Sequence, residues 1–245
     1  MTESEAQSKD TTMFSSKTAF VVGYTGEVGK QLTKELLQKN IFARVVLIGR
    51  RKVDLGTDAT SANAEQVQID FDAIDQHKAA FSGSSVGFCC LGTSREKSGK
   101  DGFFKVDHDY VLNVAKVAKE SGCEQFHLVT SGGADKNSFL FYLKTKGLVE
   151  EHVEELKFPK LFIYRPGMLL SDREQRRIAE KTINFLLKPI YTLCPTWMSA
   201  PVETVAKAML ANLWNKPKAE NGVEIVNNAE IHKLGGDFEK MFEQK

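Results

Sequence analysis

Tyr142 and Lys146 stand four positions apart in the stretch YLKTK, in the middle of the chain. The tyrosine could exchange a proton with a substrate, and the lysine could assist it through its positive charge. On a helix this spacing places both on one face. A phenol has a pKa near ~10 and is a poor acid or base at neutral pH, but a neighbouring ammonium favours its ionised form. Ser131 precedes the pair as a candidate hydroxyl, and Thr130 is its rival. Together these groups could hydrogen-bond a substrate oxygen and exchange a proton with it.

A purely structural role would also account for the pair. Phe139, Tyr142 and Val149 belong to an apolar stripe at helical spacing, and Lys146 falls within it, where an unpaired charge is costly. In that interpretation Lys146 forms an ion pair with Glu150 one turn later and Tyr142 is an ordinary core residue. The position of the pair after a hydroxyl at a strand end favours the chemical role.

A ligand-binding signal comes earlier, in the stretch KTAFVVGYTGEVG from Lys17 to Gly29. An apolar run stops at Gly23, and Gly26 and Gly29 follow at intervals of three. This pattern predicts a strand, a tight turn and a helix that packs closely on the strand. The amino end of such a helix offers unpaired backbone N–H groups, so we expect a phosphate to bind there.

The second strand-like run, Ala43 to Ile48, ends at Arg50 and Arg51. Dinucleotide-binding units that prefer NAD usually have an acidic residue at this place, which binds the ribose 2′-hydroxyl. An arginine there can pair with a 2′-phosphate instead, which favours NADP(H) as the cofactor. The alternative is that two exposed arginines merely finish a strand.

These residues must be positioned by a folded framework. The rest of the chain indicates one, because strand-like runs and helical patterns alternate along it. Further strand-like runs, separated by helical patterns, are Val67 to Phe71, Val86 to Leu91, Phe126 to Thr130, Lys160 to Tyr164 and Glu224 to Val226. The alternation predicts an α/β fold with a doubly wound parallel sheet, the Rossmann arrangement, and places the candidate residues at the carboxyl ends of its strands. We expect residues 1–16 to form a disordered leader and residues 17–245 a single domain, with 168–200 as a small C-terminal segment on the substrate side.

Composition excludes several classes of protein. Lys and Arg total 33 against 32 Asp and Glu, a net charge of +1, so we expect no direct nucleic-acid binding and no general attraction to acidic membranes. The four cysteines include the adjacent pair Cys89 and Cys90, which suits a reducing, intracellular compartment better than a disulfide framework. No run approaches the ~18 apolar residues of a membrane span, and the start of the chain lacks a signal core. The five histidines show no metal-ligand spacing, so we expect no metal.

The order Gly23-x-x-Gly26-x-x-Gly29, Ser131, Tyr142-x-x-x-Lys146 and Arg165-Pro166-Gly167 resembles short-chain dehydrogenases/reductases of the extended or atypical kind, over most of the chain. The resemblance implies an NADP(H)-dependent oxidoreductase acting on an unidentified carbonyl or alcohol. Phe185, Tyr191, Trp197 and Met198 would line an apolar substrate pocket or, equally, pack in the core, and they favour an apolar substrate. Tyr142 is then the proton donor or acceptor, Ser131 binds the substrate oxygen, and Lys146 holds the nicotinamide ribose. The residues implied to bind NADPH are Gly23, Thr25, Gly26, Glu27, Val28, Gly29, Arg50, Arg51, Leu91, Gly92, Tyr142, Lys146, Leu169 and Arg177.

Two observations favour a second reading. Asp107 stands where many extended members have Asn at the start of a helix, and Asn113 lies deeper in that helix, which leaves the efficiency of turnover open. Stretches such as LIGRRK, VGFCCLGT and GADK also resemble one member of the family in particular. That resemblance implies an NADPH-binding regulatory protein with growth-suppressing character and protein partners among nuclear import factors and transcription regulators. It implies a cytoplasmic location that extends to the nucleus or nuclear envelope.

Overall fold

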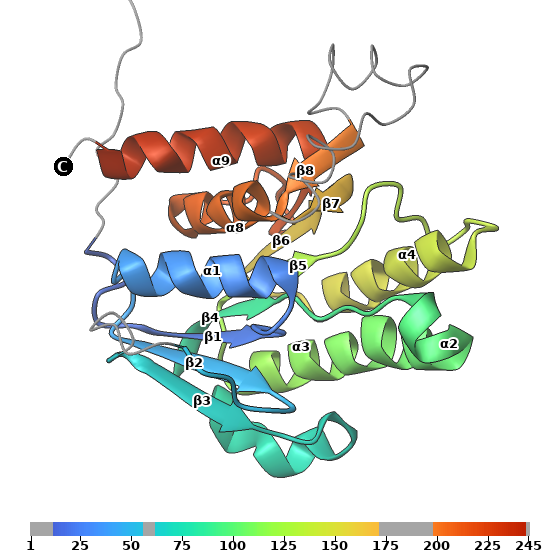
Figure 1. Ribbon diagram of the computed structural model, residues 1–245, viewed down its shortest axis with the longest axis horizontal. Coiled ribbons are helices and arrows are strands. Elements are labelled where there is room, and N and C mark those ends of the chain that lie inside the picture. The colour runs from blue at the N-terminus through green and yellow to red at the C-terminus, as the bar shows by residue number, and fades with distance from the viewer. Residues whose placement is uncertain (1–11, 56–61, 172–197, 244–245) are drawn as a thin grey trace, which may run out of the picture.

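Strands and helices alternate through most of the computed structural model, which describes residues 12–55, 62–171 and 198–243 (Figure 1). The first half contains β1 (Thr18–Val22), α1 (Glu27–Gln38), β2 (Arg44–Gly49), β3 (Ala64–Gln68), a 3-10 helix (Phe71–Phe81), β4 (Ser84–Cys89), α2 (Arg95–Phe104), a π-helical turn (Lys105–Tyr110) and α3 (Val111–Glu120). The second half contains β5 (Gln125–Val129), α4 (Phe141–Glu154), β6 (Lys160–Arg165), β7 (Met168–Leu170), β8 (Ser199–Pro201), α8 (Val202–Ala211), a 3-10 turn (Asn212–Trp214), β9 (Val223–Asn227) and α9 (Asn228–Glu243).

Seven parallel strands form the main sheet in the order β3-β2-β1-β4-β5-β6-β9. The order reverses beside β1, whose last residue Val22 is in register with Ile48 of β2 on one side and Cys89 of β4 on the other. The prediction of a doubly wound parallel sheet is therefore confirmed. Because all strands run in one direction, the turns after β1, β2, β4, β5 and β6 meet at one edge, beside the switch in strand order. A separate two-stranded sheet joins β7 to β8.

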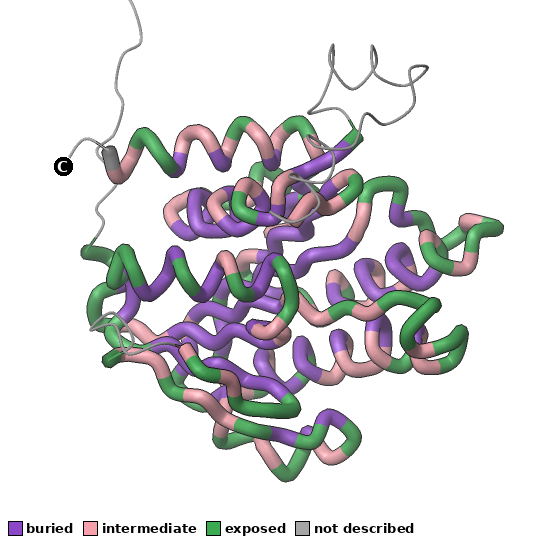
Figure 2. The backbone as a smooth tube through the Cα atoms, in the orientation of Figure 1, coloured by how far each residue is buried: buried purple, intermediate pink, exposed green. Residues whose placement is uncertain are grey.

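Helices cover both faces of the sheet, so its strands are buried on both sides (Figures 1 and 2). In β1, Ala19 and Val21 pack toward α1, α8 and α9, whereas Phe20 and Val22 pack toward α3 and α4. This double burial explains why the strands read as unbroken apolar runs rather than as alternating ones. No helix within the described ranges is long and apolar enough to cross a membrane.

The edge strand differs from its prediction. The run Val67 to Phe71 was expected to be extended, but β3 ends at Gln68. Asp70 begins the following 3-10 helix by accepting a hydrogen bond from the backbone N–H of Asp72 at 2.9 Å, and Phe71 turns into the core on the α3 side. The cap and this burial outweigh local strand propensity at the edge of the sheet.

The expected leader also needs correction at its end. Phe14 is 2% exposed, and its ring centroid lies 5.2 Å from that of Phe42 and 5.7 Å from that of Trp214. Assigning it to a disordered leader was wrong, because a single aromatic residue in a polar stretch can join the core through contacts that periodicity does not reveal. Residues 1–11 lie outside the described residues.

Replacing Phe14 should therefore destabilise the whole domain. We expect Phe14→Ala to lower the free energy of unfolding by about 3 to 5 kcal/mol, because it removes a buried ring from the cluster with Phe42 and Trp214. Met13→Ala, at a side chain that is 49% exposed, should change it by less than about 0.5 kcal/mol. Urea unfolding of both variants measures the difference, and equal stability would place Phe14 outside the core.

Candidate functional site

The glycine turn after β1 has a geometry that side chains would block. Gly23 has φ of +80°, and a Cβ there would lie 2.6 Å from the carbonyl oxygen of Cys90. A Cβ at Gly29 would overlap the carbonyl oxygen of Gly23. Gly26 caps the amino end of α1 in an extended conformation, and its N–H donates to Gly23 O at 2.9 Å. The turn therefore packs tightly against the end of β4 and exposes the start of α1, which is the arrangement that binds a phosphate group.

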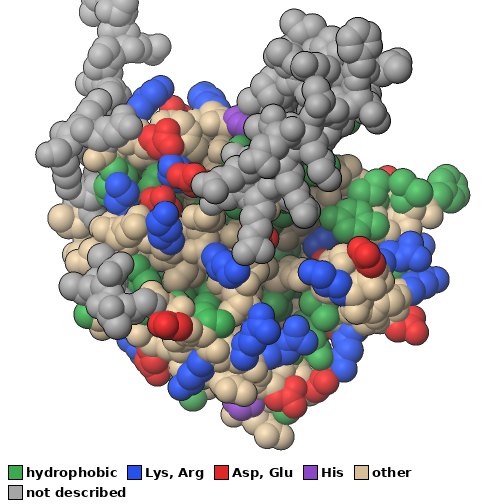
Figure 3. All heavy atoms as spheres, viewed as in Figure 1, with side chains coloured by type: hydrophobic (Ala, Val, Ile, Leu, Met, Phe, Trp, Pro, Cys, Tyr) green, Lys and Arg blue, Asp and Glu red, His purple; other side chains and the backbone are tan. Residues whose placement is uncertain are grey.

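A cleft of about 610 Å³ opens over this turn, in the size range of ligand sites. It is lined by residues that follow β1, β2 and β4 and by the helical segments around them: Gly23, Tyr24, Thr25, Gly26, Gly49, Arg50, Arg51, Phe71, Cys90, Leu91, Gly92, Thr93, Lys97, Val106 and Tyr110. In the space-filling view, Lys and Arg side chains stand around the middle of this face (Figure 3). The cleft thus gathers seven of the predicted cofactor residues: Gly23, Thr25, Gly26, Arg50, Arg51, Leu91 and Gly92.

Other predicted cofactor residues lie elsewhere. Glu27, Val28 and Gly29 form the first turn of α1, behind the cleft lining. Leu169 lies in β7 and packs against the core on the α1 side rather than in the cleft. Arg177 lies outside the described residues, as does most of the predicted substrate-side segment 168–200.

The sequence analysis missed part of the lining. Phe71 and Tyr110 stack with their ring centroids 5.3 Å apart and form one wall of the cleft. Both were assigned only to a strand or to helical periodicity. Phe71 reaches the cleft because β3 ends before it, and Tyr110 is one of many residues at helical spacing, so no local signal marked either as a lining residue.

Tyr24 holds the end of β2 in place. Its hydroxyl donates to the backbone carbonyl of Arg51 at 2.7 Å and to Oε1 of Gln66 at 2.9 Å. Burial raises the pKa of the Tyr24 phenol, and the nearby Arg51 guanidinium lowers it by less, so the hydroxyl stays a donor at neutral pH. The Arg50 and Arg51 side chains are exposed and form no hydrogen bond or ion pair with any described residue. Their backbone is fixed while their guanidinium groups remain available to an anion.

Lys146 on α4 forms a buried ion pair, but not with Glu150. Its Nζ lies 2.6 Å from Oδ1 of Asp107 in the π-helical turn, and the side chains of Lys146 and Asp107 are 6% and 1% exposed. Oδ2 of Asp107 accepts a hydrogen bond from the backbone N–H of Thr93 at 2.8 Å. Thr93 lines the cleft, so Asp107 links the cleft wall directly to the candidate ammonium.

Tyr142 is not the core residue of the structural alternative. It is 39% exposed, and its ring centroid lies 5.4 Å from that of the buried Phe103. Its hydroxyl forms no hydrogen bond with any described residue. Neither Tyr142, Lys146 nor Ser131 lines the cleft, so the link through Asp107 is what connects the two parts of the candidate site.

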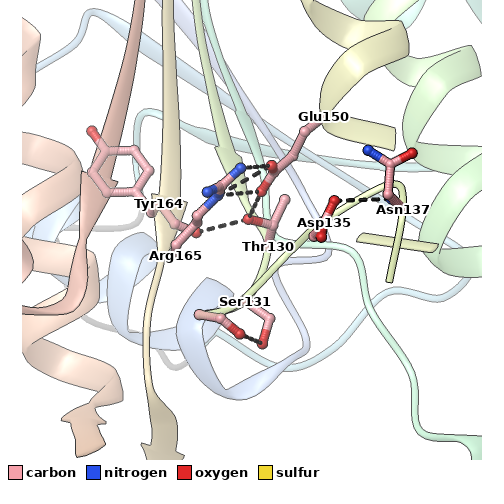
Figure 4. Close-up of polar contacts among 8 residues, drawn as sticks. Thr130, Ser131, Asp135, Asn137, Glu150, Tyr164 and Arg165 are labelled. Carbon is pink, nitrogen blue, oxygen red and sulfur yellow. Dashed lines mark hydrogen bonds and ion pairs between the residues drawn. The ribbon is translucent and has the colours of Figure 1, made fainter. Parts of the chain in front are cut away.

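The two candidate hydroxyls after β5 have different surroundings (Figure 4). Thr130 is buried, and its Oγ1 donates to Oε1 of Glu150 at 2.5 Å. Nε of Arg165 also donates to both carboxylate oxygens of Glu150, each at 3.1 Å. Ser131 lies apart from this network and is partly exposed, and among the described residues its hydroxyl donates to the backbone carbonyl of Gly132 alone, at 3.3 Å. The Thr130 hydroxyl is committed to Glu150, whereas that of Ser131 is accessible.

Thiol and metal chemistry find little support in the described part of the chain. Burial raises the pKa of Cys89 to about 12 and that of Cys90 further, so both thiols stay protonated. His127 lies between aromatic rings, and burial lowers its pKa to about 3, so it is a neutral core residue. Among the described residues, no three His, Cys, Asp and Glu side chains are grouped to hold a metal ion.

Comparison with known proteins agrees with this geometry. Residues 23–214 match a protein-family model described as NAD(P)H-binding. The chain belongs to this NAD(P)H-binding family. Protein HTATIP2 of Rattus norvegicus is 46% identical over 225 residues, which cover 90% of each chain. Protein FMP52-1, mitochondrial, of Scheffersomyces stipitis is 31% identical over 226 residues, 91% of this chain and 99% of that one.

Solved structures share the fold at low sequence identity. An oxidoreductase of the short-chain dehydrogenase/reductase family from Burkholderia thailandensis superposes with a TM-score of 0.64 at 14% identity, covering 88% of this chain and 92% of that one. MoeE5 in complex with UDP-glucuronic acid and NAD superposes with a TM-score of 0.61 at 15% identity, covering 85% and 75%. These likenesses establish the Rossmann-like architecture. The choice between NAD and NADP and the reaction depend on the residues themselves.

The Lys146–Asp107 pair generates a stability prediction. Lys146→Met should lower the free energy of unfolding by about 3 to 5 kcal/mol, because it leaves a buried carboxylate without its counter-charge. Adding Asp107→Asn should recover most of that loss, since the amide is neutral and its oxygen can still accept from Thr93 N–H. A double-mutant cycle in urea measures both. Additive losses would mean that the two side chains do not interact.

Proposed function

We propose that this protein is an NADP(H)-dependent oxidoreductase that reduces a carbonyl or oxidises an alcohol. The observation that carries the proposal is the cleft itself: a glycine turn with no room for a side chain at Gly23 or Gly29, and two guanidinium groups at the end of the next strand that pair with no described residue. NAD(P)H binding by the family supports the cofactor class. The preference for NADP(H) is inferred from Arg50 and Arg51.

The residues present fit such a cofactor. The backbone N–H groups of the glycine turn and the start of α1 would hold the pyrophosphate, and Arg50 and Arg51 the 2′-phosphate. Leu91 and Gly92 line the cleft on the β4 side, and Lys146 would hold the nicotinamide ribose. When bound, the nicotinamide cofactor supplies or accepts a hydride.

The chain's own residues would manage the substrate oxygen and its proton. Ser131 has an accessible hydroxyl that can donate a hydrogen bond to the oxygen, and Tyr142 has an exposed hydroxyl that can give or take the proton. Phe103 lies against the Tyr142 ring, and Met168 and Met198 are exposed at the two described ends of the segment 168–200. These side chains favour an apolar substrate, as the sequence suggested.

A regulatory function is the second candidate, and one observation favours it. The carboxylate of Asp107 already balances the ammonium of Lys146, so the positive charge that proton exchange would use is partly cancelled. A protein of this kind would bind NADPH with little turnover and signal its occupancy to protein partners. The sequence resemblance suggests transcription regulators and nuclear import factors as these partners. It suggests the cytoplasm and the nucleus as the compartments. The yeast relative carries the word mitochondrial in its name, which leaves the compartment a proposal.

Cofactor preference is tested without a substrate. We expect the wild-type chain to bind NADPH more tightly than NADH in fluorescence titrations. Arg50→Ser/Arg51→Ser should weaken NADPH binding about tenfold to a hundredfold, the worth of lost charge-assisted hydrogen bonds, and change NADH binding less than about twofold. Arg44→Ser is the matched control, because Arg44 is exposed at the opposite end of β2 and pairs with Glu65. Equal affinity for both nucleotides, or equal losses in both, would contradict the assignment.

The role of Tyr142 is tested with a panel of apolar aldehydes, ketones and alcohols. Tyr142→Phe should lower turnover by about a hundredfold or more, since proton transfer loses its donor, and change NADPH affinity less than about twofold. Its stability should be close to wild type, because the hydroxyl makes no hydrogen bond with any described residue. Full turnover in this variant would remove Tyr142 from the mechanism. No NADPH consumption by the wild type across the panel would favour the regulatory function.

A further inference from the structure

Two adjacent apolar side chains project from the loop before α4. Phe139 is 106% exposed and Leu140 is 65% exposed, the two highest values among the large hydrophobic residues described. The loop is ordered by its own hydrogen bonds: the Leu140 N–H donates to Oγ of Ser138 at 3.1 Å, and the Leu140 carbonyl accepts from Lys144 N–H at 2.9 Å. These bonds fix the Leu140 backbone at the start of α4, and both side chains are exposed there. We call Phe139 and Leu140 the apolar tip.

The tip stands on a packed aromatic base. The ring centroid of Phe141 lies 6.0 Å from that of Phe103 and 6.4 Å from that of Phe104. Phe103 is fully buried and also contacts Tyr142. This base joins the end of α2 to the start of α4. It therefore supports the loop that carries the tip when the tip binds a surface.

Two cations lie against that base. The Arg95 guanidinium is 5.6 Å and the Lys100 ammonium 5.0 Å from the centre of the Phe141 ring. Lys144 is exposed one turn after Leu140, and none of these three cations forms an ion pair with a described residue. Glu96 and Asp101 lie on α2 as well, so this end of the molecule carries charges of both signs, with the cations against the Phe141 ring. Hydrophobic side chains project at the α4 end of the molecule with Lys and Arg side chains beside them (Figure 3).

We propose that the apolar tip docks on an anionic lipid bilayer. Exposed aromatic and aliphatic side chains that enter the headgroup region, next to cations that meet lipid phosphates, are the two contributions that bind proteins to such surfaces. The choice of lipid follows from the cations beside the tip, because Arg95 and Lys100 can meet the phosphates of the headgroups that Phe139 and Leu140 would enter. The net charge of +1 gives no overall attraction, so binding depends on this local group of residues.

Docking would also bring the candidate catalytic residue Tyr142 close to the bilayer. Tyr142 follows the tip by two positions and is itself 39% exposed. If the proposed oxidoreductase function holds, an apolar substrate could reach Tyr142 from the bilayer without crossing water. The docking surface does not require that function, and it is tested separately from it.

Vesicle sedimentation of the full chain tests the proposal. We expect binding to vesicles of phosphatidylcholine mixed with phosphatidylserine, weak binding to phosphatidylcholine alone, and a fall in binding as salt rises. Phe139→Ser/Leu140→Ser should weaken binding about tenfold or more, as should Arg95→Gln/Lys100→Gln. NADPH affinity should stay within about twofold in both variants, which shows that the fold and the cleft are intact.

Two control variants remove the same kinds of side chain, apolar and positively charged, from other parts of the surface. Met13→Ser removes an exposed apolar side chain from the segment before β1, and Lys34→Gln/Lys39→Gln removes two charges from α1 and its C-cap, where Lys39 lies 5.1 Å from the Phe242 ring centre. Neither should change vesicle binding by more than about twofold. Failure to bind anionic vesicles, or binding that survives loss of the tip, would overturn the proposal. Self-association that the tip variant abolishes, without vesicle binding, would show that a second copy of the chain covers the surface instead.

Discussion

The buried ion pair between Lys146 and Asp107 is the interaction on which the rest of the site depends. Two charges withdrawn from water are tolerated only when each satisfies the other, so the pair fixes where its two helical segments meet. The second oxygen of Asp107 binds the backbone of Thr93, in the loop after β4. One carboxylate therefore joins three elements, namely the loop that lines the cleft, the π-helical turn and α4. Displacing any of them would leave a buried charge or N–H group unsatisfied.

The same pair constrains the chemistry. An ammonium balanced by a carboxylate at 2.6 Å exerts a weaker net field on a neighbouring phenol than a lone ammonium does. A ribose hydroxyl that binds Lys146 must therefore share it with Asp107. An amide at position 107 would leave the Lys146 ammonium without a counter-charge. The carboxylate of Asp107 therefore affects both proposed functions, because it holds Lys146 in place and also reduces its electrostatic effect. The Asp107 carboxylate fixes the position of the Lys146 ammonium and weakens the field that this ammonium exerts on other groups.

The local features could be predicted from the sequence, and the long-range ones could not. The glycine turn, the strand ends and the two arginines are encoded within about thirty residues of each other, and the alternation of strands and helices determines which edge they share. The partner of Lys146 was not predictable in this way: Glu150 is one helical turn away, whereas Asp107 comes from another element altogether. The choice between Thr130 and Ser131 likewise depends on Glu150, which reaches Thr130 only in the folded chain. Phe14 shows the same limit, since its burial depends on Phe42 and Trp214.

Three polar residues on α4 explain how the helix can be both fixed and open. Tyr142, Lys146 and Glu150 follow one another at intervals of four, so they lie along one side of the helix. Lys146 ties that side to the loop after β4 through Asp107, and Glu150 ties it to the ends of β5 and β6 through Thr130 and Arg165. Its middle and later turns are held at these two points, and its first turn packs on Phe103 and Phe104 through the rings of Phe141 and Tyr142, so α4 stays in place without a hydrogen bond from the Tyr142 hydroxyl. Tyr142 can therefore remain partly exposed, as its proposed role in proton transfer requires.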